Sequence, residues 1–239
     1  MPSLFLVKGQ KSKVSSSRSG GFALVELLVA VTLFGVIASV VLLTYSRVGE
    51  QLFMTTLAYE MALSLRQAQS YGVAVRASRA GGAYGFDAAY GLHFAGGERA
   101  RFVFFADGKR DGAALRYDGV HDETGCVTGL GSECVSVFRI ERGNRIEKFC
   151  GVLPQDGGRD APDEAKREEC NQSSTPPSNP SATIAFLDIL FRRPNPDALI
   201  RTDLSGQGER YRAARVYLAS PRGELRVVEA VATGQISIK

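Results

Sequence analysis

The sequence contains no tryptophan and only two histidines, His93 and His121. The two histidines lie far apart, and neither is accompanied by a serine or cysteine pattern of the kind that nucleophilic enzymes use. No glycine-rich phosphate-binding motif follows a predicted strand. These absences argue against an enzyme, and we expect neither a catalytic residue nor a cofactor.

Acidic residues are absent from the first 21 positions, which carry Lys8, Lys11, Lys13 and Arg18. The chain of 239 residues has 29 basic and 25 acidic residues, so removing these four cations leaves 25 of each sign. A neutral remainder argues against a generally nucleic-acid-binding surface. The excess positive charge therefore belongs to the N-terminal segment.

An apolar run, Phe22–Leu43, is long enough to cross a bilayer as a helix, for which about 20 residues are needed. The cations before it place the N-terminus in the cytoplasm and the rest of the chain outside. Glu26 interrupts the run near its start, although a carboxylate inside a membrane costs roughly 2.5–3.5 kcal/mol on insertion scales. A cleaved secretory signal is disfavoured because no small-x-small site follows the run, and a plain anchor leaves Glu26 unexplained.

Cleavage between Gly21 and Phe22 would explain Glu26. The new α-amine of Phe22 would lie at the start of the apolar helix, where an amine and a carboxylate neutralise each other in low dielectric. Within one helix the two groups lie about one turn apart, and between two offset helices they pair in trans. Glu26 would then set the register of assembly.

The stretch Gly21–Val29, GFALVELLV, resembles the type IV prepilin cleavage and methylation motif. Pilins, minor pilins and the pseudopilins of type II secretion and competence systems share this motif. The resemblance implies that a prepilin peptidase cuts after Gly21 and methylates Phe22, and that Glu26 acts in filament assembly. The implied partners are other pilin or pseudopilin subunits, an inner-membrane assembly platform and membrane lipid. Gly35 falls where pilins often have a helix-weakening glycine, whereas the proline that kinks many pilin helices is absent.

The helical pattern continues beyond the apolar run. Apolar residues recur there at spacings of three or four, and this stripe predicts an amphipathic helix packed on a sheet; its members are Phe53, Leu57, Met61, Leu65 and Ala68. The pattern ends at Gly81-Gly82. The expected organisation is a cleaved basic leader (1–21), a transmembrane helix (22–44), an amphipathic extension (45–80) and a strand-rich extracytoplasmic head (81–239).

Short runs with a period of two follow the glycines and predict a mainly antiparallel head packed on one helix, an α+β fold of pilin type. The predicted strands are Tyr90–Phe94, Arg101–Phe105, Ala114–Tyr117, Cys134–Ile140, Arg145–Cys150, Thr183–Phe191, Ala214–Ala219, Glu224–Val231 and Gln235–Ile238. Three stretches resemble the GspH/FimT-like branch of pseudopilins and minor pilins: Leu65–Gln69, Phe104–Gly108 and Glu229–Ile236.

Residues 154–182 are rich in proline, glycine and serine, which predicts an exposed polar loop that serves partner contact or is a tolerated insertion. Outside the membrane, four cysteines favour two disulfides. Of the three connectivities, we favour the one in which each bond closes a short loop, Cys126–Cys134 with Cys150–Cys170. A Cys₄ zinc site is the disfavoured alternative because no C-x-x-C pair is present.

Two further sites are weaker alternatives. Asp107, Asp111 and Asp118 suggest calcium but do not match the calcium-loop spacing, so we expect no metal. A basic cluster could contact DNA phosphates on a DNA-uptake minor pilin; it consists of Arg139, Arg142, Arg145 and Lys148, interleaved with Glu141 and Glu147. An ordinary membrane-anchored extracytoplasmic domain is the third functional alternative.

Overall fold

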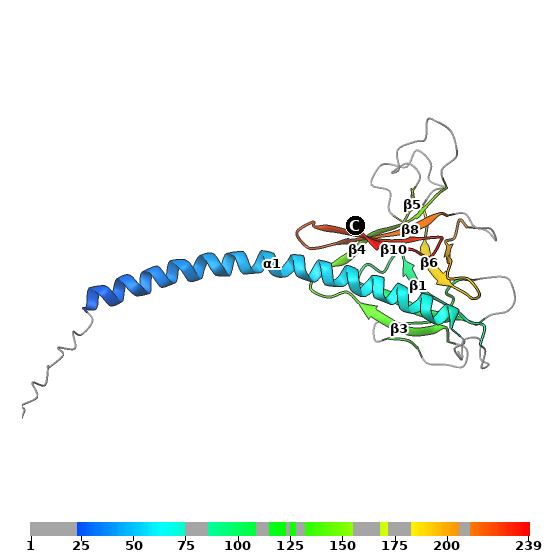
Figure 1. Ribbon diagram of the computed structural model, residues 1–239, viewed down its shortest axis with the longest axis horizontal. Helices are drawn as coiled ribbons and strands as arrows, with labels where there is room; N and C mark the ends of the chain where they lie inside the picture. The colour runs from blue at the N-terminus through cyan, green and yellow to red at the C-terminus, as the bar shows by residue number, and fades with distance from the viewer. Residues whose placement is uncertain are drawn as a thin grey trace, which may run out of the picture. The chain divides into compact units, whose positions relative to one another are not determined.

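The computed structural model describes residues 23–74, 86–108, 115–122, 125–127, 132–154, 168–171, 183–205 and 211–239. The chain divides into two compact units at the Arg47–Val48 junction. The long helix α1 (Leu24–Val73) contributes residues to both units, and the second unit contains all the described strands (Figure 1). We call this second unit, which begins at Val48, the head.

Ten strands follow α1 in the described part of the chain, and they form two five-stranded sheets. In spatial order the first sheet comprises β3 (Cys134–Arg139), β2 (Arg101–Asp107), β1 (Ala89–Ala95), β6 (Phe186–Phe191) and β7 (Ala198–Arg201). The second comprises β10 (Ile236–Ile238), β9 (Leu225–Val231), β8 (Ala213–Ala219), β4 (Arg145–Val152) and β5 (Glu168–Cys170).

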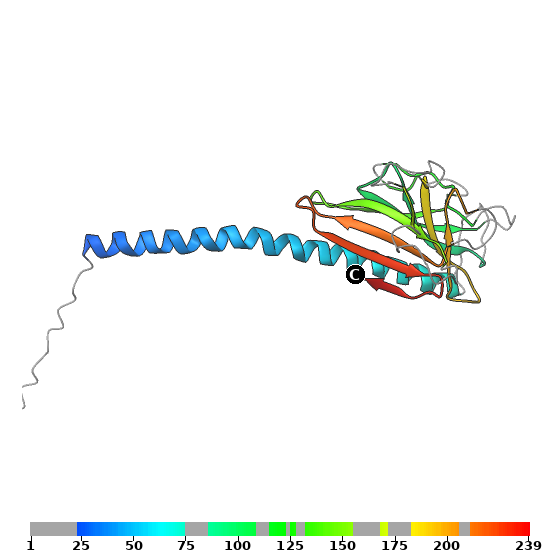
Figure 2. The same cartoon turned by 90° about the horizontal axis from the view of Figure 1, so that it is seen from above.

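All strand pairings in both sheets are antiparallel. Figure 2 shows β8, β9 and β10 as neighbouring ribbons, with β10 running to the C-terminus. The long helix and the antiparallel sheets confirm the predicted α+β, pilin-like arrangement.

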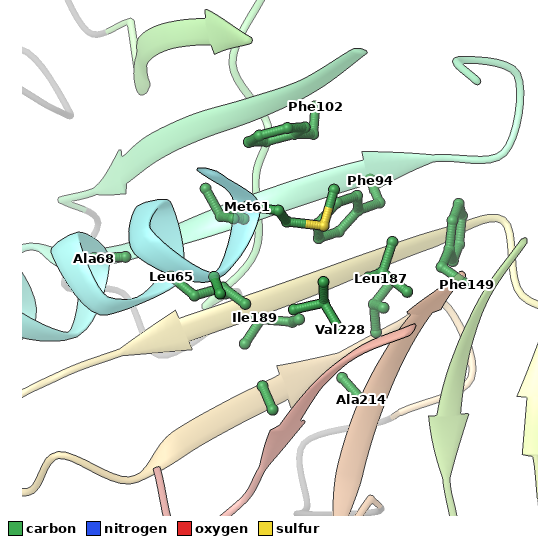
Figure 3. Close-up of a cluster of buried hydrophobic side chains, with 14 of the residues drawn as sticks. Met61, Leu65, Ala68, Phe94, Phe102, Phe149, Leu187, Ile189, Ala214 and Val228 are labelled. Atoms are coloured by element: carbon green, nitrogen blue, oxygen red, sulfur yellow. The ribbon is translucent and has the colours of Figure 1, made fainter. Parts of the chain in front are cut away.

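A single hydrophobic core joins the head part of α1 to both sheets. Met61 and Leu65 project from α1 toward Phe94 and Ile189 of the first sheet and Val228 of the second (Figure 3). The fully buried positions of the helix recur every three or four residues, which places them on one face; they are Met54, Ala58, Met61, Leu65 and Ala68. The predicted stripe is thus correct from Leu57 onward, since Leu57 is partly buried and packs against the core. Its first member, Phe53, is 39% exposed, and the buried face begins instead at Met54.

The C-terminal end of α1 packs directly against β6. A side chain at Gly72 would place its Cβ 2.2 Å from the carbonyl oxygen of Phe191, so only glycine permits this approach. The carbonyl of Gly72 also accepts a hydrogen bond from the backbone N–H of Arg193 at 3.0 Å. The helix ends at Val73, whereas the sequence predicted an extension to 80; residues 75–80 lie outside the described residues.

The outer face of the first sheet is also covered. Tyr117 packs there on Val103, Phe105 and Leu190 in a second apolar cluster. The predicted strand Ala114–Tyr117 is therefore wrong in its described part, because Leu115–Tyr117 forms no ladder. Leu115 and Tyr117 instead pack on the face of the sheet. An alternation of apolar residues alone does not distinguish a strand that pairs within a sheet from a segment that packs on its face.

Three other strand predictions differ from the structure. β5 lies inside the predicted loop 154–182, because Glu168–Cys170 pairs with Cys150–Val152 of β4. β7 was not predicted, since its four residues are too few to show a clear period. The predicted strand at Thr183 begins only at Phe186, and Thr183 instead forms an isolated bridge to Cys170.

Candidate functional site

The start of α1 is an apolar segment, Leu24–Leu42. Its 19 residues have a mean hydropathy of 2.5 and none is buried, so it is long and apolar enough to cross a membrane. Large apolar side chains point outward on every side of it, as at Leu28, Phe34 and Val40, which are 56%, 75% and 60% exposed. Such a surface suits lipid or other apolar helices rather than water.

The polar side chains of this segment are arranged for an apolar surrounding. The hydroxyl of Thr32 donates to the carbonyl of Val29 at 2.9 Å, and the hydroxyl of Ser39 donates to that of Gly35 at 2.7 Å. Hydroxyls that bond to their own helix avoid an unsatisfied polar group in hydrocarbon. Glu26, in the first turn of α1, is the single charged residue of Leu24–Leu42.

The first turn of α1 suits a carboxylate. The backbone N–H of Glu26 donates to the carbonyl of Ala23 at 2.9 Å, and the N-terminal end of a helix favours negative charge. Among the described residues Glu26 has no cationic partner. Gly21 and Phe22, the predicted cleavage and methylation positions, lie outside the described residues, so the predicted pairing of the Phe22 amine with Glu26 stays a prediction.

The comparison with known families concerns this same segment. A family model, the prokaryotic N-terminal methylation motif, matches residues 16–42. The chain has a type IV prepilin-like N-terminus. The match contains Gly21, Phe22 and Glu26, ends where the apolar segment ends and does not reach the head. No curated protein and no solved structure matches the chain significantly.

The prepilin-like N-terminus implies processing by a prepilin peptidase and, with the apolar helix, anchoring in the inner membrane before assembly. Proteins with such N-termini are generally structural subunits rather than enzymes. The family match does not distinguish the GspH/FimT-like branch from others, because the stretches that suggested this branch lie in the head.

Two disulfides stabilise the head. Cys126 bonds to Cys134, and Cys150 bonds to Cys170, which are the pairs that the spacing favoured. The second bond joins residues that face each other directly on β4 and β5. All four sulfurs are used, so the cysteines do not form a Cys₄ zinc site.

The predicted basic cluster lies around the turn between β3 and β4, but its charges are partly compensated. Arg145 pairs with Glu147 at 2.8 Å, and Lys148 lies 3.8 Å from Glu168 and over the ring of Tyr217.

Arg142 of the same turn stacks over the ring of Phe53, with 3.6 Å between its guanidinium carbon and the ring centre. Arg139 is exposed at the end of β3. Of the four cations, three thus have acidic or aromatic partners, which weakens the case for a surface that binds phosphates.

Arg142 and Gly143 form the turn itself, with φ values of 61° and 74°. A left-handed backbone is unfavourable for arginine by about 1 kcal/mol or more. The stacking on Phe53 offsets part of this cost, because a cation over an aromatic face contributes about 0.5–1 kcal/mol at exposed sites. A shallow groove of about 290 Å³ lies beside this turn, lined by residues of α1 such as Glu60 and by Arg139, Glu141 and Asn144 of the turn.

A buried acid–base pair lies on the outer face of the first sheet. His93 of β1 and Asp188 of β6 face each other in register, with 2.6 Å between Nδ1 and Oδ1. Asp188 is fully buried, and its Oδ2 accepts the backbone N–H of Tyr117 at 2.9 Å. Burial raises the pKa of Asp188 above its ordinary value, while the contacts with His93 and Tyr117 oppose this rise.

The second histidine is connected to the same place. Nδ1 of His121 lies 3.0 Å from the hydroxyl of Tyr117, and Nε2 lies 2.9 Å from Oε2 of Glu98. Burial, with the negative charge of Glu133 as a further cause, raises the pKa of Tyr117 to about 12. A phenol that resists ionisation is poorly suited to act as a nucleophile.

Charged groups also cross the outer face of the second sheet. Arg215 of β8 donates to Glu229 of β9 at 2.6 Å and to Glu168 of β5 at 2.8 Å, and Lys239 lies 2.7 Å from Glu229. Burial alone would raise the pKa of Glu229, but the hydrogen bonds from Lys239 and Arg215 lower it below its ordinary value. These pairs hold β5, β8, β9 and the C-terminus together.

In the described part of the chain, one group of residues of the kinds that bind metal ions lies close together, and it consists of Cys150, Glu168 and Cys170. The two sulfurs are bonded to each other and are not thiolate ligands. Of the aspartates considered for calcium, Asp107 is buried at the end of β2, Asp118 is exposed, and Asp111 lies outside the described residues. The calcium alternative, which includes Asp111, is therefore not tested by the described residues.

Sequence reasoning missed the association of the two histidines. His93 and His121 are 28 positions apart, yet Tyr117 contacts both rings. One signal was available, because Asp188 interrupts the apolar run of a predicted strand, and a carboxylate there requires a buried partner. The partner itself depends on strand order, which the sequence does not state.

Proposed function

We propose that this chain is a structural subunit of a type IV pilus, type II secretion or competence-type filament, as a minor pilin or pseudopilin. The observation that carries the proposal is a prepilin-like motif that coincides with the exposed apolar segment Leu24–Leu42, whose single carboxylate is Glu26. A prepilin peptidase removes residues 1–21 in the cytoplasm and methylates Phe22. The head then lies on the extracytoplasmic side of the membrane.

In this proposal the apolar segment packs among the helices of sister subunits in the filament. Glu26 neutralises the α-amine of Phe22, either its own or that of a neighbour, and so sets the stagger between subunits. The low dielectric among apolar helices makes this pairing strong and makes an unpaired carboxylate costly. The head provides the outer surface of the filament.

The DNA-uptake alternative has less support. Arg142, Arg145 and Lys148 contact Phe53, Glu147 and Glu168, so a DNA strand would compete with existing partners. Weak, salt-independent binding of DNA to the full-length chain would agree with this, whereas strong binding that falls steeply with salt would favour the alternative.

The first test is the intact mass of the full-length chain from cells with and without a prepilin peptidase. We expect loss of residues 1–21 and gain of one methyl group only when the peptidase is present. A chain that stays uncut beside an active peptidase would contradict the proposal and favour an ordinary anchored domain.

A second test separates processing from assembly. In Glu26→Gln the charge is removed at nearly constant size, and we expect normal cleavage but loss of the chain from sheared or cross-linked filaments. The control is Glu60→Gln, which changes an exposed carboxylate in the head part of the same helix. Equal incorporation of both variants would contradict the role of Glu26.

A further inference from the structure

The outer face of the first sheet has its own cover, residues 115–122 and 125–127, which we call the covering segment. Beneath it lie Val103, Phe105 and Leu190, all fully buried. The ring of Tyr117 packs against that of Phe105, with 5.2 Å between ring centres. Without the covering segment, a strip of apolar side chains would face water.

Two backbone hydrogen bonds attach the covering segment to buried carboxylates. The N–H of Tyr117 donates to Asp188 at 2.9 Å, and the N–H of Asp118 donates to Glu133 at 3.0 Å. Both acceptors are almost completely inaccessible, with 0% and 1% exposure. The protection of these two amides from solvent therefore reports directly whether the covering segment is closed.

The far end of the covering segment forms a small ribbon. His121 bridges Cys126, and the N–H of Val127 donates to the carbonyl of Val120 at 3.2 Å. An isolated pair of such short strands is marginally stable in water. The bond from Cys126 to Cys134 connects this ribbon covalently to the first residue of β3.

We propose that the Cys126–Cys134 disulfide is a redox latch that closes the covering segment over the outer face of the first sheet. In the reduced chain the two thiols are separate, the ribbon opens, and the apolar strip is accessible. Closing transfers two electrons and two protons from the two thiols to the disulfide of a thiol oxidoreductase, which leaves as a dithiol. Reduction by a dithiol reverses the step. This proposal concerns the head alone and does not depend on filament assembly.

The second disulfide provides the matched comparison. Cys150 is fully buried and Cys170 is half-buried, whereas Cys126 and Cys134 are both half-buried. An attacking thiolate therefore has a partly exposed residue at both ends of the Cys126–Cys134 bond and at only one end of the other.

The ribbon lies outside both sheets, and His121 links it to Glu98 at 2.9 Å. β5, in contrast, is paired with β4 in the second sheet, and it has two further links, because Glu168 accepts from Arg215 at 2.8 Å and Glu169 accepts from Tyr211 at 2.5 Å. We therefore expect β5 to stay in place without its sulfur bond.

The test is amide hydrogen exchange of the full-length chain in detergent, resolved to single residues. In Cys126→Ser/Cys134→Ser we expect the amides of Tyr117 and Asp118 to exchange at least about tenfold faster than in the wild type. In Cys150→Ser/Cys170→Ser the same two amides should keep wild-type rates. Oxidised glutathione should restore slow exchange to reduced wild-type chain.

The amide of Leu92, a fully buried residue of β1, distinguishes a local latch from a bond that the whole fold needs. A latch leaves its protection unchanged when Cys126 and Cys134 are replaced. Loss of protection at Leu92 together with Tyr117 would show that the bond is needed for the whole fold and would overturn the proposal. Unchanged protection at Tyr117 and Asp118 in that variant would overturn it as well.

Discussion

The two parts of α1 are both apolar, yet they bury their side chains in different surroundings. In Leu24–Leu42 none of the helix is buried within the chain, and Leu28 is 56% exposed. In the head part, Met61 and Leu65 are completely buried between the sheets. Mean hydropathy therefore shows that a helix has apolar surface, whereas the distribution of apolar side chains around the helix indicates what covers that surface.

The distribution follows from the sequence. The first part is apolar on every side, so it requires a surrounding of lipid or other helices. The second part is apolar on one side, and its other side carries residues such as Thr55 and Arg66, which are suited to water. The head should therefore fold independently of changes in the apolar segment, and three variant pairs test this.

The largest expected effect is in the core. Leu65→Ala leaves a cavity at a site with no exposure, and we expect it to lower the free energy of unfolding of the head by about 2–5 kcal/mol. Leu28→Ala makes the same chemical change in the apolar segment and should leave head unfolding unchanged. Thermal unfolding in detergent, followed by tyrosine circular dichroism, measures both. Equal destabilisation would show that the two parts are coupled.

A smaller effect is expected from the two glycines of the same helix. In Gly72→Ala the new methyl group meets the Phe191 carbonyl, and we expect a loss of about 1–3 kcal/mol. Gly35→Ala adds a methyl group with no neighbour within 4 Å, so only the better helix propensity of alanine acts there. Head melting temperatures should fall for the first variant alone. An unchanged melting temperature of the head in Gly72→Ala would contradict the close approach of α1 to β6.

The smallest effect is expected when a carboxylate paired with cations, Glu229, is compared with an exposed carboxylate, Glu60. Glu229 in the head has two cations beside it and a lowered pKa, so its charged form stabilises the fold. This contribution is complete above the ordinary value of 4.5 and is lost as the pH falls through the lower folded-state pKa. Glu229→Gln should therefore cost about 1 kcal/mol at neutral pH and progressively less under acid.

Melting temperatures of the wild type and Glu229→Gln between pH 7 and pH 3 check this expectation, with Glu60→Gln as an exposed control. A difference that stays constant across the range would show that the ion pairs contribute nothing. Glu26→Gln should not change head melting at any pH, because its carboxylate acts in the apolar segment.

The local features of the molecule were readable from spacing. Apolar residues three and four apart predicted the head part of α1, and alternation predicted most strands, because both depend on neighbours in the chain. The prepilin-like motif was readable for the same reason, since Gly21, Phe22 and Glu26 lie within a few positions of one another. Each disulfide joins a cysteine to the next cysteine along the chain, so the pairing too could be predicted from spacing.

Other features were not readable because they depend on partners distant in the chain. The division into two sheets depends on which strands pair. β1 pairs with β2, which follows it in the chain, and also with β6, whose Asp188 lies 95 positions after its partner His93. The start of the covering segment, Leu115–Tyr117, was predicted to be part of a strand, because packing on the face of a sheet and pairing within a sheet give the same alternation of apolar residues. Arg142 was assigned to a basic cluster, although its guanidinium stacks on Phe53 of α1.

Spacing along the chain is enough to specify a membrane-length apolar helix with a processing motif, an amphipathic continuation and a strand-rich head. Each of these depends on spacing within one segment, where backbone geometry leaves few choices. The folded arrangement, in contrast, is needed to know that both sheets share one core with α1, that Asp188 contacts His93, and that a disulfide joins the covering segment to β3. These contacts arise when distant segments bury apolar surface together, and buried polar groups must then find partners in the one arrangement that forms.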